Sequence, residues 1–214
     1  MPKLAIFDLD GTLVDTRNDI VDAMNVTLST FGFEQKDLSS FRTLIGNGSR
    51  HMVESLVPES IAPQAYEYFF KQYDSHLTDN TRPYPEVEQT LRALTANGSQ
   101  IAVVTNKYHT QAELILQRLF PNIHFDAIQG YLRGEPRKPD PASALKVLEQ
   151  LGISADNSLF IGDTQIDIET ASAAGMKSVF VTWGYGDIND LIEYKADYTI
   201  DRMSNLLTLT SNSD

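Results

Sequence analysis

The sequence predicts an α/β fold in which a doubly wound parallel sheet carries one inserted all-helical segment. Three features support this prediction: short apolar runs recur along the chain, helix-length patterns separate them, and one long interval has no such run. Nearly continuous apolar runs are typical of strands that are buried on both faces of a parallel sheet. Repeated alternation of strand and helix then gives the doubly wound arrangement.

The expected strands and helices alternate along the chain. We expect strands at 4–7, 101–104, 125–128, 159–161, 178–181 and 198–200. Helical patterns cover 87–97, 110–119, 141–151 and 166–174. Gly98, Gly152 and Gly175 stand at the ends of three of these patterns. Glycine is favoured there because it readily adopts the left-handed conformation that ends many helices.

The interval without strands predicts a second domain. Residues 16–82 contain only amphipathic helical patterns, so the core with the sheet is expected to comprise residues 1–15 and 83–214. Pro83 and Pro85, which cannot continue a helix, favour a linker back into the sheet. The apolar positions of the three patterns are Ile20, Met24, Val26, Leu28 and Phe31, then Met52, Val53, Leu56 and Val57, then Tyr66, Phe69, Phe70 and Tyr73.

The bulk composition excludes several classes of function. A formal net charge of −12 argues against nonspecific nucleic-acid binding, which needs a basic surface. The absence of cysteine rules out disulfides, thiolate metal sites and cysteine nucleophiles. No signal peptide is expected, and no apolar stretch approaches the roughly 18 residues of a membrane span. We therefore expect a cytoplasmic protein without nucleic-acid or membrane partners, and the oligomeric state is left open.

Two aspartates follow the first expected strand. Ligands bind at the carboxyl ends of the strands in an open parallel sheet, and Asp8 and Asp10 would lie there on the same side of the extended chain. Carboxylates this close repel each other, which favours a cation between them or a proton on one. Gly11 then turns the chain so that neighbouring amides can face an anion. Alone, the pattern is also typical of an ordinary acidic loop.

A second pair of aspartates follows the strand at 159–161. Asp163 and Asp167 are four residues apart at a helix start, so both carboxylates can share one face. Asp163 could cap that helix, but capping accounts for only one of the two. A Mg²⁺ site made of oxygen ligands accounts for both, with Asp8 and Asp163 as direct ligands and Asp167 in support.

Two further strand ends carry groups that can bind phosphate. Thr105, Asn106 and Lys107 follow the strand at 101–104, and a hydroxyl there can donate to a phosphate oxygen. Lys138 follows the strand at 125–128 and precedes Pro139, which keeps it out of helical geometry. A strand-ending threonine and a solvated lysine are the ordinary alternatives, and the position at strand ends is what favours function.

The four motifs together resemble the haloacid-dehalogenase superfamily of phosphatases. Residues 8–16, DLDGTLVDT, resemble its first motif, and residues 103–106, VVTN, its second. Lys138 with Pro139 resembles the third motif, and residues 162–167, GDTQID, the fourth. The resemblance covers the whole chain, and the helical insertion is similar to the C1 cap of that family.

The resemblance implies a mechanism for a small phosphate ester. Asp8 would be the nucleophile and form an aspartyl-phosphate. Asp10 would protonate the leaving alcohol and then activate water. Mg²⁺ would bind the Asp8 carboxylate, the Asp10 backbone carbonyl and Asp163, with Asp167 behind them. The groups that hold the phosphate oxygens would be Thr105, Asn106 through its amide, and Lys138.

Two other functions stay open. True dehalogenases lack the second aspartate, which Asp10 supplies here, but sugar phosphomutases keep both, so a mutase of the β-phosphoglucomutase type is the enzymatic alternative. A catalytically silent binding module on the same fold is the non-enzymatic one. The binding module is disfavoured because every expected catalytic position is filled.

Substrate choice is expected to depend on the helical insertion. Residues 45–50, IGNGSR, resemble a cap loop of phosphoglycolate phosphatases, as do residues 105–107, TNK, and 183–186, WGYG, elsewhere. We expect Arg50, or else Lys107, to meet an anionic group of the substrate, although Arg50 could equally be a solvated helix residue. Glu86 stands where that subgroup has a hinge glycine. The histidines, which show no metal-ligand spacing, are His51, His76, His109 and His124.

Overall fold

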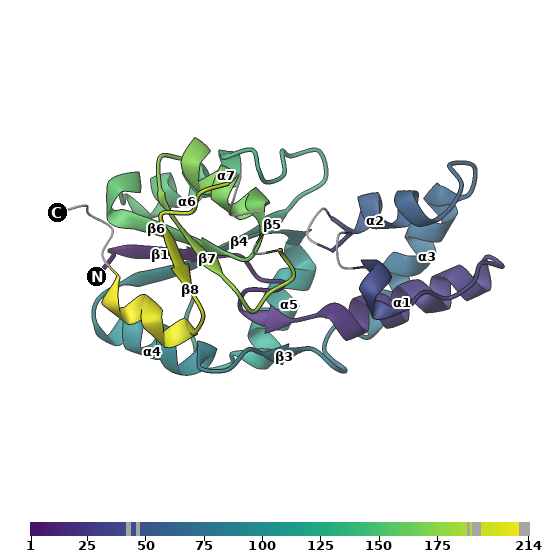
Figure 1. The fold of residues 1–214 in the computed structure, drawn as a ribbon, viewed down its shortest axis with the longest axis horizontal. Helices are drawn as coiled ribbons and strands as arrows, with labels where there is room; N and C mark the ends of the chain where they lie inside the picture. Colours follow the sequence, from purple (N-terminus) through teal and green to yellow (C-terminus); the bar gives the residue numbers. More distant parts are fainter. Residues whose placement is uncertain (42–43, 46–47, 188, 190–193, 210–214) are drawn as a thin grey trace. The chain divides into compact units, whose positions relative to one another are not determined.

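The fold is that of a computed structural model that describes residues 1–41, 44–45, 48–187, 189 and 194–209 (Figure 1). The chain divides into two compact units. Residues Met1–Val14 and Pro83–Asp214 form the first unit, and Asp15–Arg82 form the second. No helix in the described part of the chain is long and apolar enough to span a membrane.

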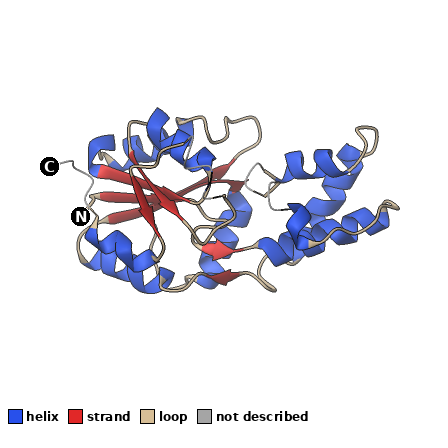
Figure 2. Ribbon diagram, in the orientation of Figure 1, coloured by secondary structure: helices blue, strands red, loops and turns tan. Residues whose placement is uncertain are grey.

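A parallel sheet organises the first unit. Among the described residues it has six strands in the order β5-β4-β1-β6-β7-β8 (Figure 2). These strands are β1 (Leu4–Phe7), β4 (Gln100–Tyr108), β5 (Ala127–Tyr131), β6 (Ser158–Gly162), β7 (Lys177–Val181) and β8 (Tyr198–Ile200). The strand order reverses at β1, which pairs with both β4 and β6. The carboxyl ends of these three strands therefore meet at the switch point where ligands bind in such sheets.

Helices cover both faces of the sheet, which confirms the predicted fold class (Figures 1 and 2). The helices are α4 (Val87–Ala96), α5 (His109–Leu119), α6 (Ala142–Leu151) and α7 (Gln165–Ala173). Side chains of α6 and α7, such as Val147 and Ala171, pack with Leu4, Ile6 and Phe160 in one buried cluster. Helices α4 and α5 lie on the other face (Figure 1). Gly152 ends α6 at φ 66°, in the left-handed conformation expected of it.

Two strands differ from the sequence prediction by more than one residue at an end. β5 begins at Ala127 instead of residue 125. β4 continues to Tyr108 instead of ending at residue 104, and its register against β5 shifts between Val104 and Tyr108. The prediction ended β4 where its apolar run ended, because the three polar residues that follow are typical of a loop.

The second unit is helical. It contains α1 (Arg17–Thr30), a 3₁₀ helix η1 (Leu38–Phe41), α2 (Ser49–Leu56) and α3 (Ala62–Ser75). The short strands β2 (Val14–Asp15) and β3 (Arg82–Pro83) pair where the chain leaves and re-enters the first unit. Asp19, which is 3% exposed, joins the two ends of the unit by accepting hydrogen bonds from the Thr81 hydroxyl at 2.7 Å and the Thr81 N–H at 2.8 Å.

One apolar position of this unit was predicted wrongly. Val26 was expected on the buried face of α1, but it is 44% exposed, whereas Met24 and Leu28 are buried. Residues two positions apart lie on different faces of a helix, so Val26 cannot share the face of its two neighbours in the pattern. The expected cap loop includes Gly46 and Asn47, which lie outside the described residues.

Candidate active site

Three buried aspartates meet at the carboxyl ends of β1 and β6. Asp8 follows β1 directly, and its N–H continues the ladder to the Ile161 carbonyl at 2.8 Å. Asp163 follows β6, and Asp167 lies in the first turn of α7. One carboxylate oxygen from each lies within 4.8 Å of the others. The structure therefore brings together the three carboxylates that the sequence predicted as a metal site.

Lys138 lies between two of these aspartates. Its Nζ is 2.6 Å from Asp167 Oδ1 and 3.0 Å from Asp8 Oδ1. The side chains of Lys138, Asp8 and Asp167 are 3%, 9% and 2% exposed. Charges this deeply buried need partners, because water no longer solvates them. One ammonium beside three carboxylates leaves the cluster with an excess of negative charge.

The pKa values reflect that excess. Burial, with the nearby Asp167 and Asp10, raises the pKa of Asp8 to about 6 although Lys138 opposes the shift. Burial and the same repulsion from Asp167 and Asp8 raise the pKa of Asp163 well above its usual value. Burial alone would lower the pKa of Lys138, but the attraction of Asp167 and Asp8 outweighs burial, so the pKa is raised. The ionised forms of Asp8 and Asp163 are therefore destabilised, and additional positive charge nearby would stabilise them.

Asp163 is held by residues that the sequence analysis did not place in the site. Its Oδ1 accepts a hydrogen bond from the Thr12 hydroxyl at 2.9 Å, and its Oδ2 accepts one from the Tyr185 N–H at 2.7 Å. Glycine allows this packing, because a Cβ on Gly11, at φ 87°, or on Gly184 would collide with the Asp163 side chain. The glycines of residues 183–186 were the signal for this contact, and sequence reasoning used them only as a resemblance.

Thr164 and Asp167 together, and not Asp163, cap α7 in a capping box. The N-cap residue is Thr164, and Asp167 Oδ2 accepts hydrogen bonds from its N–H at 3.0 Å and its hydroxyl at 2.9 Å. Asp167 Oδ1 accepts the bond from Lys138. The alternative in which Asp163 only caps the helix is therefore wrong. Asp167 is engaged on both oxygens, which suits a supporting position.

Asn106 fixes the backbone of Lys138. Its Oδ1 accepts a hydrogen bond from the Lys138 N–H at 2.9 Å, and its Nδ2 donates to the Lys138 carbonyl at 3.1 Å. The pair of bonds joins the end of β4 to the segment after β5. Thr105, which is 5% exposed, lies on the same extension of β4. The groups predicted to bind phosphate thus share one buried strand end with the contacts that position Lys138.

Lys107 lies beside Asp10. Its Nζ is 2.9 Å from each carboxylate oxygen of Asp10, and the two side chains are 4% and 13% exposed. The sequence assigned Lys107 to a substrate anion and gave Asp10 no side-chain partner. The pairing was not predictable, because it depends on the extension of β4 beyond residue 104.

Arg50 belongs to the helical unit. It lies on α2, 3.4 Å from Glu54 Oε1 and with its guanidinium 4.7 Å from the centre of the Tyr66 ring. Its side chain is 44% exposed. Its contacts in that unit are those of a solvated helix residue, and its part in substrate binding stays a prediction.

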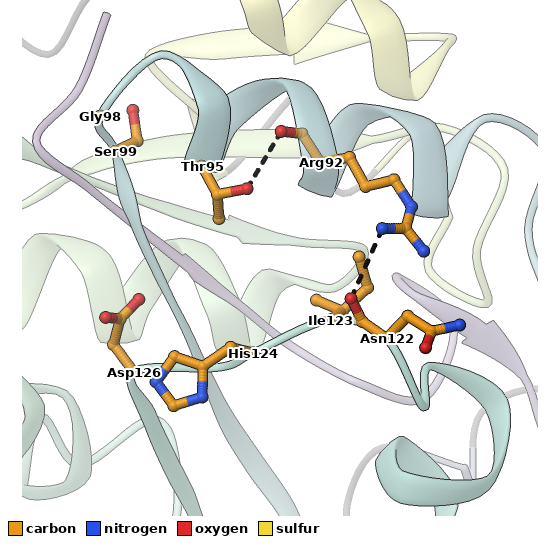
Figure 3. A pocket seen from close by; sticks show the side chains of 8 residues that line it. All are labelled: Arg92, Thr95, Gly98, Ser99, Asn122, Ile123, His124 and Asp126. Atoms are coloured by element: carbon orange, nitrogen blue, oxygen red, sulfur yellow. Dashed lines mark hydrogen bonds between the residues drawn. The ribbon is translucent and has the colours of Figure 1, made fainter.

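A separate hollow lies at the opposite, amino-terminal ends of β4 and β5 (Figure 3). Its volume is about 420 Å³, and it is lined by Arg92, Thr95, Gly98, Ser99, Asn122, Ile123, His124 and Asp126. Its charged groups are bound locally: Arg92 donates to Glu88 at 2.7 Å, and Asp126 accepts from the Ile101 N–H at 2.9 Å. None of the predicted site residues lines it, and those of the aspartate cluster lie at the other end of the sheet.

The aspartate cluster fits a divalent metal ion. Asp8 Oδ1 is buried and accepts no hydrogen bond, although Lys138 forms an ion pair with it. The carboxylates of Asp163 and Asp167 are fixed in direction by the bonds described above. Hard oxygen donors with excess negative charge are the ligands that Mg²⁺ takes in proteins, usually through one or two carboxylates.

Comparisons with known proteins cover both units of the chain. Residues 5–181 match the family described as haloacid dehalogenase-like hydrolase. The phosphoglycolate phosphatase of Aquifex aeolicus (strain VF5) is 37% identical over 210 residues, which are 98% of this chain and 97% of that protein. That of Agrobacterium fabrum is 36% identical over 94% of this chain and 89% of the other.

Solved structures agree with these matches. A crystal structure described as a predicted phosphoglycolate phosphatase from Haemophilus somnus 129PT has a TM-score of 0.89 and 31% sequence identity, over 96% of each chain. A phosphoglycolate phosphatase described in the same way from Lactobacillus delbrueckii also reaches 0.89, at 27% identity, over 96% of this chain and 97% of that one. The fold and the sequence therefore lead to the same family.

Proposed function

The chain belongs to the haloacid dehalogenase-like hydrolase family and is a phosphatase, and from that premise we propose that it cleaves small phosphate monoesters through a phospho-aspartate on Asp8. The observation that carries the proposal is the position of Asp8, buried at the end of β1 beside the Lys138 ammonium and the Asp163 carboxylate. We propose 2-phosphoglycolate as the first substrate to test, because the relatives at 37% and 36% identity carry that name.

In the first half-reaction, a carboxylate oxygen of Asp8 attacks phosphorus in line with the leaving oxygen. The new O–P bond forms as the bond from phosphorus to the alcohol oxygen breaks, and that oxygen takes a proton from the Asp10 carboxyl. With a pKa of about 6, Asp8 is largely ionised at neutral pH and so able to attack. The products are the free alcohol and the phospho-aspartate.

In the second half-reaction, water attacks the phosphorus of phospho-Asp8. Asp10, now a carboxylate, takes a proton from that water, and the bond between phosphorus and the Asp8 oxygen breaks. Inorganic phosphate leaves, and both carboxyl groups return to their starting states. The same residue acts as acid and then as base, so its direction toward the reacting oxygen matters in both halves.

Lys138 and the end of β4 hold the phosphoryl group. Lys138, 3.0 Å from Asp8, offsets negative charge on the nucleophile and on the phosphoryl oxygens. The Thr105 hydroxyl and the Asn106 backbone amide donate hydrogen bonds to those oxygens. Because phosphoryl transfer needs little covalent chemistry beyond the nucleophile, these fixed donors supply much of the rate enhancement.

A divalent metal ion at the aspartate cluster would complete the charge balance. Asp8, Asp163 and the Asp10 carbonyl would hold Mg²⁺, with Asp167 positioned behind by Lys138 and Thr164. When bound, the ion supplies electrostatic shielding between the anionic nucleophile and the anionic phosphate. Its binding also relieves the repulsion that raises the pKa of Asp8 and Asp163.

The helical unit is where we expect further substrate discrimination. In sequence it resembles a cap, and Arg50 is its candidate cation for an anionic part of the substrate. We propose that Arg50 favours esters whose alcohol carries a carboxylate. Arg50→Ala should then lower kcat/KM for 2-phosphoglycolate more than for 2-hydroxyethyl phosphate, the analogue in which a hydroxymethyl group replaces the carboxylate.

The experiment is phosphate release from a panel of esters, with Mg²⁺ and with EDTA. The panel contains 2-phosphoglycolate, 2-hydroxyethyl phosphate, sugar phosphates and nucleoside monophosphates, with a mutase assay on β-glucose 1-phosphate. We expect Mg²⁺-dependent release that Asp8→Asn reduces on the order of 10⁴-fold or more, because the nucleophile is lost. Asp197→Asn, at the far end of the sheet, is the matched control and should leave turnover unchanged.

Three results would change the assignment. An isomerised sugar phosphate without net phosphate release would assign a mutase. Release that survives in Asp8→Asn would exclude Asp8 as the nucleophile. No reaction with any ester, from folded protein with Mg²⁺, would favour the silent binding module.

A further inference from the structure

The end of β4 differs from an ordinary strand end. Thr105, Asn106 and Lys107 are all buried, at 5%, 9% and 8% exposure, although they are polar and consecutive. The register shift against β5 lies in this segment. A shift of this kind bends a strand locally and redirects its side chains, and it is typical of strands beside active sites.

A glycine on β5 makes room for this bend. A Cβ on Gly130 would lie 2.9 Å from the Lys107 carbonyl oxygen and 2.5 Å from the His109 Cα, which is closer than a side chain can approach. The Gly130 N–H donates to His109 Nδ1 at 3.3 Å. The backbone from the Lys107 carbonyl to His109 is therefore packed closely against β5, which fixes the base of the lysine side chain.

The other end of the side chain contacts Asp10 symmetrically. Nζ is 2.9 Å from Oδ1 and 2.9 Å from Oδ2. One ammonium on both oxygens fixes the rotation of the carboxylate about its Cβ–Cγ bond, which an exposed aspartate leaves nearly free. Asp10 lies in the tight turn after β1, where the Gly11 N–H donates to the Val14 carbonyl at 2.9 Å.

We propose that Lys107 is the positioning residue for Asp10: it holds the carboxyl group that gives the proton to the leaving alcohol and later takes one from water. The inference rests on the function proposed above. A proton donor must lie within hydrogen-bond reach of the reacting oxygen. An error of about 1 Å in such a group costs about 10²-fold in rate. Lys107 therefore acts through Asp10 and not on the substrate.

The choice of leaving group distinguishes positioning of Asp10 from a purely structural role of Lys107 and from binding of the substrate. Expulsion of 4-nitrophenolate needs no proton, whereas expulsion of an alkoxide does. The value of kcat/KM reports the steps up to release of the alcohol, and so it isolates the first half-reaction. Lys107→Met should lower kcat/KM about 10- to 100-fold for 2-hydroxyethyl phosphate and no more than about 3-fold for 4-nitrophenyl phosphate.

Further readouts belong to the same experiment. Because water activation also depends on Asp10, Lys107→Met should show a burst of nitrophenolate that approaches one per active site before the slow steady state. Lys107→Met should cost nothing further when Asp10→Asn is already present, since the two act as one unit. Lys107→Arg, which keeps a cation able to contact both oxygens, should lie between Lys107→Met and the natural chain.

Lys177→Met is the matched control. It also removes a short lysine–aspartate pair of this unit, that of Lys177 with Asp197 at 2.8 Å, from the opposite end of the sheet. It should leave the ratio of the two kcat/KM values unchanged. The melting temperature of every variant is measured, so that loss of folded protein is not taken for loss of positioning.

Distinct results would overturn the inference. Equal losses with the alkyl and the nitrophenyl ester would mean that Lys107 supports the structure only. A raised KM for 2-phosphoglycolate, with 2-hydroxyethyl phosphate unaffected, would make Lys107 a binding residue for the substrate carboxylate. Either outcome would leave the proposed phosphatase function of the natural chain standing. Only a natural chain that cleaves no ester would overturn that function.

Discussion

The two ends of the sheet use lysine–aspartate pairs differently. At the amino-terminal ends of β7 and β8, Lys177 lies 2.8 Å from Asp197, with side chains 38% and 33% exposed. At the carboxyl ends of β1 and β6, Lys138 lies 2.6 Å from Asp167 and 3.0 Å from Asp8, and all three are almost fully buried. The distances are alike, so the difference lies in burial and in the balance of charge.

The pKa shifts of the two ends have opposite signs. Burial raises the pKa of Asp197 in part, but bonds from Lys177 and from the Ser178 N–H and hydroxyl outweigh it and lower the pKa. The pKa of Asp8 is raised to about 6, because burial and neighbouring carboxylates exceed the effect of Lys138. A satisfied carboxylate stabilises the fold, whereas an unsatisfied buried one is reserved for a ligand or a reaction.

Among the tests of this contrast between the two ends, the largest expected effect is on metal binding at the carboxyl end. Asp163→Asn removes the charge of the proposed direct ligand and should reduce Mg²⁺ affinity and turnover by at least about 10²-fold. Asp167→Asn, which changes the residue proposed to lie behind the metal, should cost less, about 10-fold in affinity. Calorimetric titration with Mg²⁺ measures both, and Asp197→Asn is the control. Equal losses in the two site variants would contradict the assignment of Asp163 as the direct ligand.

A smaller effect concerns stability in the absence of metal. A folded-state pKa above the unfolded value means that the native state binds the proton more tightly, so stability falls as pH rises. For Asp8 the window runs from the ordinary value of 3.8 to about 6. In EDTA, the melting temperature of the natural chain should fall across this window relative to that of Asp8→Asn, by several degrees.

Magnesium should reduce that difference, because it compensates the repulsion among the carboxylates and stabilises the native state by binding to it. The measurement is thermal unfolding of both chains from pH 4 to pH 7, with and without Mg²⁺. Parallel curves for the natural chain and Asp8→Asn in EDTA would mean that Asp8 carries no excess repulsion, and the contrast between the two ends of the sheet would fail.

How far the sequence predicts this site depends on the kind of contact. Asp8 and Asp163 were predictable because each directly follows a strand with a clear apolar pattern. Lys138 was identified instead by the proline that follows it and by its resemblance to the third motif. Thr12 and the Tyr185 N–H were not, since they reach Asp163 from distant loops and one acts through its backbone. The pairing of Lys107 with Asp10 depends on a shift in strand register, which no alternation of polar and apolar residues records.

The backbone conformation of Glu86 is a second feature that the local sequence pattern does not predict. By sequence, Glu86 stands where the phosphoglycolate phosphatase subgroup has a hinge glycine. In the structure Glu86 adopts φ 66°, a conformation that favours glycine. Its carboxylate is bound by the Arg202 guanidinium and, at 3.2 Å, by the Ser204 N–H, and these bonds lower its pKa to about 2. The partners lie over a hundred residues away, so local pattern could not supply them.

The smallest expected effect is on stability at the amino-terminal end of the sheet. There the dependence of stability on pH has the opposite sign to that at Asp8. The lowered pKa of Asp197 means that its contribution to stability is present above the unfolded value of 3.8 and is lost as pH falls through the folded value. Because the pair with Lys177 is more than a third exposed on the lysine side, solvent screens it, and Asp197→Asn should lower the melting temperature only slightly at pH 7. The difference in melting temperature between Asp197→Asn and the natural chain should shrink only as pH falls below 3.8. The difference between Asp8→Asn and the natural chain should already be closed there, because Asp8 is then protonated in both the folded and the unfolded state. Thermal unfolding of the two variants in one pH series tests this, and shifts of the same sign would show that burial does not separate the two ends of the sheet.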